Sequence, residues 1–297
     1  MKRPEACIKE YVLHKLLLAI GFARCYIMYR ICNTYYLSTR GYKSMIKNAG
    51  KTAAEKAATI TNNPKAYLDS ITVHITKDNS KTGIWSINTL AGGKEHGYNG
   101  AGNSAVITAL ESATGEKCNG TCTGDCPGCY AKKETRYPDV LINMFENTLL
   151  AKRDPVAFWK AVEKEIYSGA LIPAIFRIHD SGDFFSYEYF SACVDMIKRH
   201  PETKFGAYTK EKEIVERYGI ENLPDNFSLQ CSPWPGHCEP IGDLPQFCYD
   251  NGSNPELAKL PHCPAVDCHG NRTGVQCINC RHCYNAKRGQ KWAVYAH

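Results

Sequence analysis

The sequence contains no apolar run long enough to cross a membrane and no clear export signal. Near its start, the stretch LLLAIGFA covers only residues 16–23, between Lys15 and Arg24. A membrane-spanning helix needs about 20 apolar residues, and a secretory signal ends in a small-residue cleavage site that this stretch lacks. We therefore expect residues 1–65 to form a helical N-terminal extension of a cytoplasmic protein with no membrane partner.

Dense positive charge is also missing. The net charge is +6, but no block of Lys and Arg demands a nucleic-acid partner. The nearest approach to a basic stripe lies near the C-terminus, in Arg281, Lys287, Arg288 and Lys291. The sequence has no internal repeat, and its Gly-rich stretch 91–105 lacks the strand–GxGxxG–helix context of a phosphate-binding loop.

Cysteine, in contrast, is abundant, since the chain has 16. In a short secreted protein such a number predicts disulfides, but a chain of 297 residues can bury a core without them. Most of the cysteines fall into two tight groups, within residues 118–129 and 263–283. In a reducing compartment, clustered cysteines indicate metal binding or redox chemistry.

From residue 66 onward, strand patterns alternate with helix patterns. Residues 70–90 form two alternating runs that predict a β-hairpin. Asp154 and Pro155 mark the start of a second helix after one over 137–153, and Ser186 caps a third. Buried strands are expected within 171–184, 204–210 and 226–234.

Strands that alternate with helices build a mainly parallel sheet, whose chemistry lies at the C-terminal ends of the strands. The polar stretches HDSGDF, YTK and CSPW follow the expected strands. About four strands can be counted, and residues 103–112 are the only candidate for a strand before the first cysteine group. We therefore expect an α/β domain over 66–240 and a Cys-rich, irregular, metal-binding region over 241–297.

The first cysteine group has the spacing C-x3-C-x2-C, in Cys122, Cys126 and Cys129. Iron–sulfur clusters are held by thiolates gathered on one short loop, and glycines let the backbone curl around the cluster. Three thiolates on a four-iron cluster leave one iron open to a small chelating molecule. Zinc is the alternative, although its structural sites draw cysteine pairs from separate segments. Cys118 is either a fourth ligand or a nearby free thiol.

The second group has the spacing C-x2-C-x2-C, in Cys277, Cys280 and Cys283. The remote Cys263, followed by proline, would complete the ligand pattern of a bacterial ferredoxin in reversed order. Four thiolate ligands would leave no iron of this cluster open to another molecule. Cys268 competes as the fourth ligand, and zinc is a stronger rival here because three histidines lie close by in the sequence.

The C-x3-C-x2-C motif followed by an aromatic residue resembles the signature of the radical S-adenosylmethionine (radical SAM) superfamily. That resemblance implies a partial (β/α) barrel in which the open iron binds SAM, and an electron then cleaves SAM to start radical chemistry. Together, CPGCYA, RIHDSGDFFSYEYF, YTK and the C-terminal cysteines also resemble a phage-borne family known as gene product eighty-eight. This second resemblance covers residues 82–284 and implies no established substrate.

The resemblance also implies roles for individual residues. Asp183 would hold the SAM amino group, and Gly182, Tyr130 and Lys210 would join it as cofactor-binding residues. Apart from the resemblance, His179 stands beside two carboxylates, Asp180 and Asp183, which suggests proton transfer. The alternative is a polar strand end whose side chains cap neighbouring loops. The expected cofactors are a [4Fe-4S] cluster with an open site, a second auxiliary cluster and SAM, and the expected partner is an electron donor such as a flavodoxin or ferredoxin.

Two other functions remain open from the sequence. One is a zinc-stapled module that binds nucleic acid or protein, of phage or mobile-element origin and without catalysis. The other is an iron–sulfur protein that only transfers electrons. An open three-cysteine site beside a Gly-Asp strand end favours the radical SAM interpretation over both.

Overall fold

The computed structural model describes residues 51–77, 79, 82–92, 103–122, 129, 131–233 and 239–295. Nearly all of them belong to the second of two compact units, Thr52–His297. None of the helices within these ranges combines the length and the apolar character that a bilayer crossing needs.

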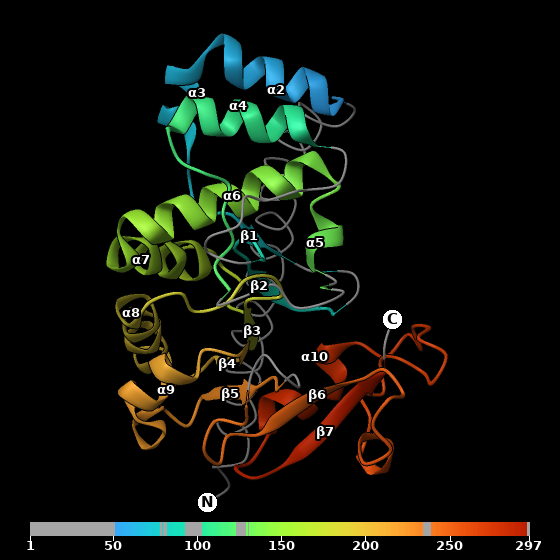
Figure 1. Cartoon of the computed structure of the whole chain (residues 1–297). Helices are drawn as coiled ribbons and strands as arrows, with labels where there is room; N and C mark the ends of the chain where they lie inside the picture. Colours follow the sequence, from blue (N-terminus) through green and yellow to red (C-terminus); the bar gives the residue numbers. More distant parts are fainter. Residues whose placement is uncertain are drawn as a thin grey trace, which may run out of the picture. The chain divides into compact units, whose positions relative to one another are not determined.

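A seven-stranded sheet runs through this unit, with its strands side by side in the order of the chain (Figure 1). The first two strands pair antiparallel, with Ile75 opposite Ile87, and every later pair is parallel. This confirms the predicted hairpin and the mainly parallel α/β sheet. The strands are β1 (Ile75–Thr76), β2 (Trp85–Ile87), β3 (Ile175–Ile178), β4 (Lys204–Thr209), β5 (Phe227–Cys231), β6 (Gln246–Asp250) and β7 (Lys291–Tyr295).

Strands β6 and β7 correct the expectation of about four strands and of an irregular C-terminal region. Both come from residues 241–297, and they extend the sheet beyond β5. Each is five residues long. Pro245 and Asn251 flank β6, and Gly289 lies two residues before β7, so local composition indicates loops. Pairing with a neighbouring strand supplies the ordering that local propensity does not. The sheet therefore crosses the domain boundary expected at 240/241.

The segment 103–112 is a helix, which corrects its reading as a strand. Helix α4 (Ser104–Thr114) buries Val106, Ala109 and Leu110, which have the spacing of a helix face, and it ends at Gly115 with a φ of 71°. It packs with α2 (Ala53–Asn62) and α3 (Pro64–Ser70) in a separate apolar cluster. Because α3 runs through residues 65 and 66, the boundary expected there falls inside a helix.

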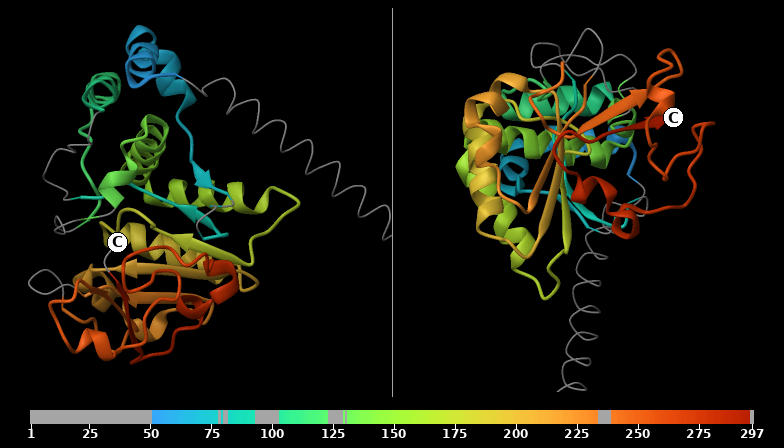
Figure 2. Two further views of the ribbon diagram at one scale, coloured as in Figure 1. Left: turned by 90° about the vertical axis from the view of Figure 1, so that its right-hand side faces the viewer. Right: turned by 90° about the horizontal axis from the view of Figure 1, so that it is seen from below.

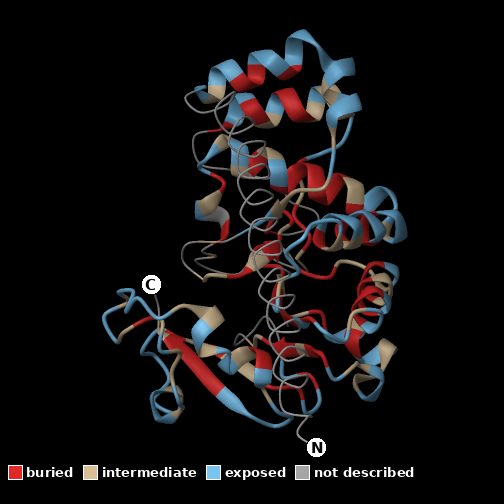
Figure 3. Ribbon diagram, turned by 180° about the vertical axis from the view of Figure 1, so that it is seen from behind, coloured by how far each residue is buried: buried red, intermediate tan, exposed pale blue. Residues whose placement is uncertain are grey.

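Four helices cover one face of the sheet (Figures 1 and 2). Asp154 and Ser186 accept hydrogen bonds from Ala157 N and Tyr189 N, which confirms both predicted N-caps. Figure 3 shows a buried side on each of these helices. Apolar residues from all four helices belong to one core cluster with strand residues such as Phe176. These helices are α6 (Pro138–Arg153), α7 (Pro155–Tyr167), α8 (Tyr187–Lys198) and α9 (Lys212–Tyr218).

Short helical turns complete the described elements. They are α5 (Ala131–Glu134), η1 (Ile220–Asn222), η2 (Leu257–Lys259), α10 (Cys277–Cys280) and η3 (His282–Asn285). Two of them, α10 and η3, carry the second cysteine group.

The other face of the sheet receives the second cysteine group. Ser86, Arg177, Gly206 and Ser228 stand opposite one another on β2 to β5, in a row of mostly small side chains. Turn η3 packs against this row: a side chain at Gly206 would come within 2.4 Å of the Tyr284 ring. Ser228 Oγ and Gln230 Nε2 donate to the carbonyl oxygen of Cys283 at 2.7 and 2.6 Å.

Replacing Gly206 by alanine tests this docking. The new methyl group would overlap the Tyr284 ring, so we expect the free energy of unfolding to fall by about 1–3 kcal/mol. Urea denaturation of the whole chain measures it. Gly169→Ala is the matched control, because the nearest atom there lies at 3.9 Å. Equal stabilities of the two variants would contradict the proposed packing.

Candidate functional site

Cys122, the first residue of the C-x3-C-x2-C motif, lies near the end of β2, although α4 separates the two in the sequence. Thr121 N donates to Leu90 O at 3.0 Å, and Cys122 N donates to Gly92 O at 3.1 Å. Gly120 permits this approach, because a side chain there would lie 2.0 Å from the Gly92 carbonyl oxygen. The chain thus places Cys122 at the C-terminal edge of the sheet.

Four predicted site residues gather at this edge. Burial raises the pKa of the Cys122 thiol, the charges of Asp183 and Cys129 raise it further, and Lys210 opposes them. Electrostatic effects of this kind weaken with distance, and here they link Cys129, Asp183 and Lys210 to the Cys122 thiol. Cys126 and Tyr130 lie outside the described residues.

Asp183 ties the ends of β3 and β4 together. Its Oδ1 accepts hydrogen bonds from Thr209 Oγ1 at 2.7 Å and Phe184 N at 2.8 Å, and Oδ2 accepts one from Lys210 N at 2.9 Å. Burial raises the pKa of this carboxyl, whereas the Lys210 ammonium and the three donors oppose the rise. The carboxyl group is therefore fixed in place beside Cys122.

Gly182 brings this strand end against the first cysteine group. Its φ is 89°, and a side chain there would lie 1.9 Å from Thr89 Oγ1. Asp183 N donates to Thr121 Oγ1 at 2.9 Å, and Thr121 Oγ1 lies 3.0 Å from Thr89 Oγ1. The sequence analysis missed both threonines, which carry no motif and act only through contacts made in the fold.

His179 lies in the aromatic core beside the helices. Its Nε2 is 3.0 Å from Tyr189 Oη, and its ring stacks on Tyr189 at 5.8 Å and lies 4.9 Å from that of Phe184. Burial, and then the charge of Arg177, lower its pKa to about 3. The imidazole is therefore neutral near pH 7. Its Nδ1 has no hydrogen-bond partner among the residues that the structure describes.

Cys118 lies in a different environment from Cys122. It is fully buried in the apolar cluster of α2, α4 and α6, together with Leu110 and Phe145. Burial raises the pKa of its thiol to about 12, and the charges that act on it belong to Glu111, Lys117 and Lys152. This environment is that of a core thiol.

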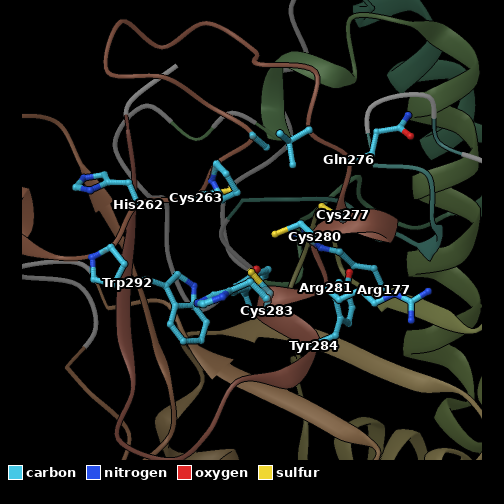
Figure 4. Close-up of a pocket in the computed structure, with 16 residues that line it drawn as sticks. Arg177, His262, Cys263, Gln276, Cys277, Cys280, Arg281, Cys283, Tyr284 and Trp292 are labelled. Carbon is cyan, nitrogen blue, oxygen red and sulfur yellow. The ribbon is translucent and has the colours of Figure 1, made fainter.

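The second cysteine group encloses one cavity of about 150 Å³ (Figure 4). Cys277 and Cys280 are on α10, and Cys283 is on η3. Cys263 lies beside β7, where its N–H donates to Ala293 O at 2.8 Å. Cys268 is exposed and does not line the cavity. The structure thus brings together the four cysteines predicted for the second cluster.

Two residues of the sheet face these thiols. The Arg177 guanidinium lies 4.6 Å from the centre of the Tyr208 ring, and its Nε lies 2.8 Å from Asp180 Oδ1. Burial raises the pKa of Cys283 to about 11, while a hydrogen bond from the Tyr208 hydroxyl opposes the rise. Burial likewise raises the pKa values of Cys263 and Cys277, and the charge of Arg177 opposes it.

Within the described ranges, no three His, Cys, Asp or Glu side chains approach one another closely enough to hold one metal ion. Cys263, Cys277, Cys280 and Cys283 nevertheless line the same cavity.

The buried neutral imidazole of His179 predicts a dependence of stability on pH. Between pH 6.5 and about 3 the unfolded chain binds a proton that the folded chain does not. The free energy of unfolding should therefore fall by about 1.4 kcal/mol per pH unit of acidification from this group. Denaturation at pH 7 and pH 5.5 should show a smaller loss for His179→Gln than for the unaltered chain. His269→Gln, at an exposed position, should leave the loss unchanged; the same loss in all three proteins would refute the assignment.

Comparison with known proteins gives the chain a family. A family model described as Gene product 88 matches residues 74–233, which is more than half of the chain. The Gene 88 protein of Mycobacterium phage L5 is 30% identical over an alignment of 132 residues, and the match covers 39% of this chain and 53% of that protein. The chain thus matches about half the length of this relative, and no solved structure matches it. The chain belongs to the Gene product 88 family.

Proposed function

We propose that this protein is an iron–sulfur protein of radical SAM type, with a SAM-binding cluster at the strand ends and a closed cluster in the C-terminal cavity. One observation carries the proposal. Cys263, Cys277, Cys280 and Cys283 come from two separate segments and line one cavity on the sheet. A second observation supports the cluster at the strand ends, because the charges of Asp183 and Cys129 act on the Cys122 thiol there.

The C-terminal cavity fits a four-iron cluster. Each of the four thiolates would bind a different iron, whereas a zinc ion would draw all four sulfurs to within about 2.3 Å of one centre. Four thiols from two separate segments on the wall of one cavity support the cluster. Trp292 also lines the cavity, and its buried indole N–H has no acceptor among the described residues. A cluster presents sulfur acceptors to such a donor.

At the strand ends, Cys122, Cys126 and Cys129 would hold the other cluster and leave one iron open. That iron would bind the amino and carboxylate groups of SAM, and the cluster would supply the electron that cleaves it. We leave Cys118 out of this ligand set because its thiol lies in the helical core. Lys210 provides a positive charge beside Cys122, which suits the SAM carboxylate.

Asp183 suits the role expected for it toward the SAM amino group. A carboxylate offers about four lone-pair sites, and hydrogen bonds from the protein occupy two on Oδ1 and one on Oδ2. The second lone-pair site on Oδ2 would accept a hydrogen bond from the ammonium group of SAM. The protein's own donors would hold the carboxylate in position for it.

The arrangement of the sheet supports a partial (β/α) barrel. Strands β2 to β7 are parallel and follow one another in chain order, and helices lie over one face (Figure 2). The face of the sheet opposite these helices would be available to the iron–sulfur clusters and SAM. An electron donor such as a flavodoxin or ferredoxin would reduce the open cluster in the cytoplasm.

Metal analysis of protein purified without oxygen tests the proposal. We expect about eight irons and eight sulfides per chain, and a change in the electron paramagnetic resonance spectrum of the reduced protein when SAM is added. A variant with serine at Cys122, Cys126 and Cys129 should keep about half of the iron and lose the response to SAM.

The control for this experiment is Cys268→Ser, since that thiol is exposed and outside the cavity. It should keep all the iron. Stoichiometric zinc without iron would overturn the proposal, and the alternative of a zinc-stapled binding module would then be tested by nucleic-acid and protein binding.

A further inference from the structure

Arg177 and Tyr208 form a fixed pair on the face of the sheet that carries the second cysteine group. Arg177 stands opposite Gly206, so Tyr208, two residues further along β4, points to the same face. The guanidinium carbon lies 4.6 Å from the centre of the Tyr208 ring. Asp180 holds Arg177 on one side, and Phe247 packs on Tyr208 with ring centres 4.8 Å apart.

Both residues reach the thiols. They line the cavity together with the four cysteines, and the Tyr208 hydroxyl donates to Cys283 Sγ. The charge of Arg177 acts on three of the thiols, those of Cys263, Cys277 and Cys283. Asp180 acts on Cys277 in the opposite direction, but less strongly than Arg177 does.

A cluster bound by four thiolates is anionic and gains a further negative charge when it accepts an electron. Hydrogen bonds to its sulfurs and a nearby positive charge therefore stabilise the reduced form more than the oxidised form. Partial burial strengthens both effects, because water screens the interaction less there than at the surface.

We propose that Arg177 and Tyr208 set the reduction potential of the C-terminal cluster, Tyr208 through its hydrogen bond to Cys283 and Arg177 through its charge beside three thiolates. The proposal rests on the function proposed above. In this proposal Arg177 and Tyr208 act on the reduction potential. Ser228 and Gln230 bind the Cys283 backbone and only hold the segment in place.

The test uses the chain with serine at Cys122, Cys126 and Cys129, so that only the C-terminal cluster remains. Tyr208→Phe removes the hydroxyl, Arg177→Gln removes the charge, and Arg177→Lys keeps the charge. A redox titration followed by electron paramagnetic resonance measures each potential. Thermal unfolding of the metal-free proteins shows whether the substitutions disturb the fold.

We expect Tyr208→Phe and Arg177→Gln each to disfavour the reduced cluster about tenfold, which lowers the potential by about 59 mV for a one-electron couple. Arg177→Lys should lie between Arg177→Gln and the parent. The metal-free forms of Tyr208→Phe and of the parent should unfold at similar temperatures, because the aromatic packing is kept.

Two controls test whether a shift in the reduction potential could come from looser packing of the Cys283 segment or from a change in the net charge of the protein. Ser228→Ala removes one hydrogen bond to the Cys283 carbonyl without touching a sulfur, and Lys164→Gln removes a charge from an exposed position on α7. Both should leave the potential at the parent value. Unchanged potentials in the Tyr208 and Arg177 variants, or an equal shift in Ser228→Ala, would overturn this inference alone. A parent that holds zinc or no metal would instead overturn the proposed function.

Discussion

The close contact between Tyr284 and Gly206 determines how the segment of α10 and η3 packs on the sheet. The ring occupies the space that a side chain on β4 would fill, and Ser228 and Gln230 anchor the neighbouring Cys283 carbonyl. Without room on the strands, η3 could not approach the sheet. Because η3 packs on the sheet, Cys283 lies beside Tyr208, and α10 lies at the cavity. Cys263, which is hydrogen-bonded to β7, lines the same cavity.

The strand-end site depends on a second close approach. Gly182 lets the turn after β3 lie against Thr89 and Thr121, and Asp183 then joins that turn to the end of β4. Three segments far apart in the sequence therefore meet at Cys122. The polar groups used for this assembly are buried and paired, as buried polar groups must be.

The part of the chain that matches the family, residues 74–233, contains the strand-end site and also the surface that receives the second cysteine group. Arg177, Gly206, Tyr208 and Ser228 all lie within it, whereas Cys263, Cys277, Cys280 and Cys283 follow it. The receiving surface and the segment that docks on it thus lie in different parts of the chain. This division explains why a reading of motifs alone, taken one segment at a time, did not connect Arg177 or Tyr208 with the cysteines.

The elements that depend on local chemistry could be predicted from the amino-acid sequence. The caps at Asp154 and Ser186, the helices that follow them, the hairpin and the grouping of Cys277, Cys280 and Cys283 were all readable from spacing and residue type. Three features became visible in the fold alone: Cys263 rather than Cys268 faces the cavity, Cys118 belongs to the core, and β6 and β7 extend the sheet. Each of these depends on contacts between residues distant in the chain, and neither spacing nor propensity encodes such contacts.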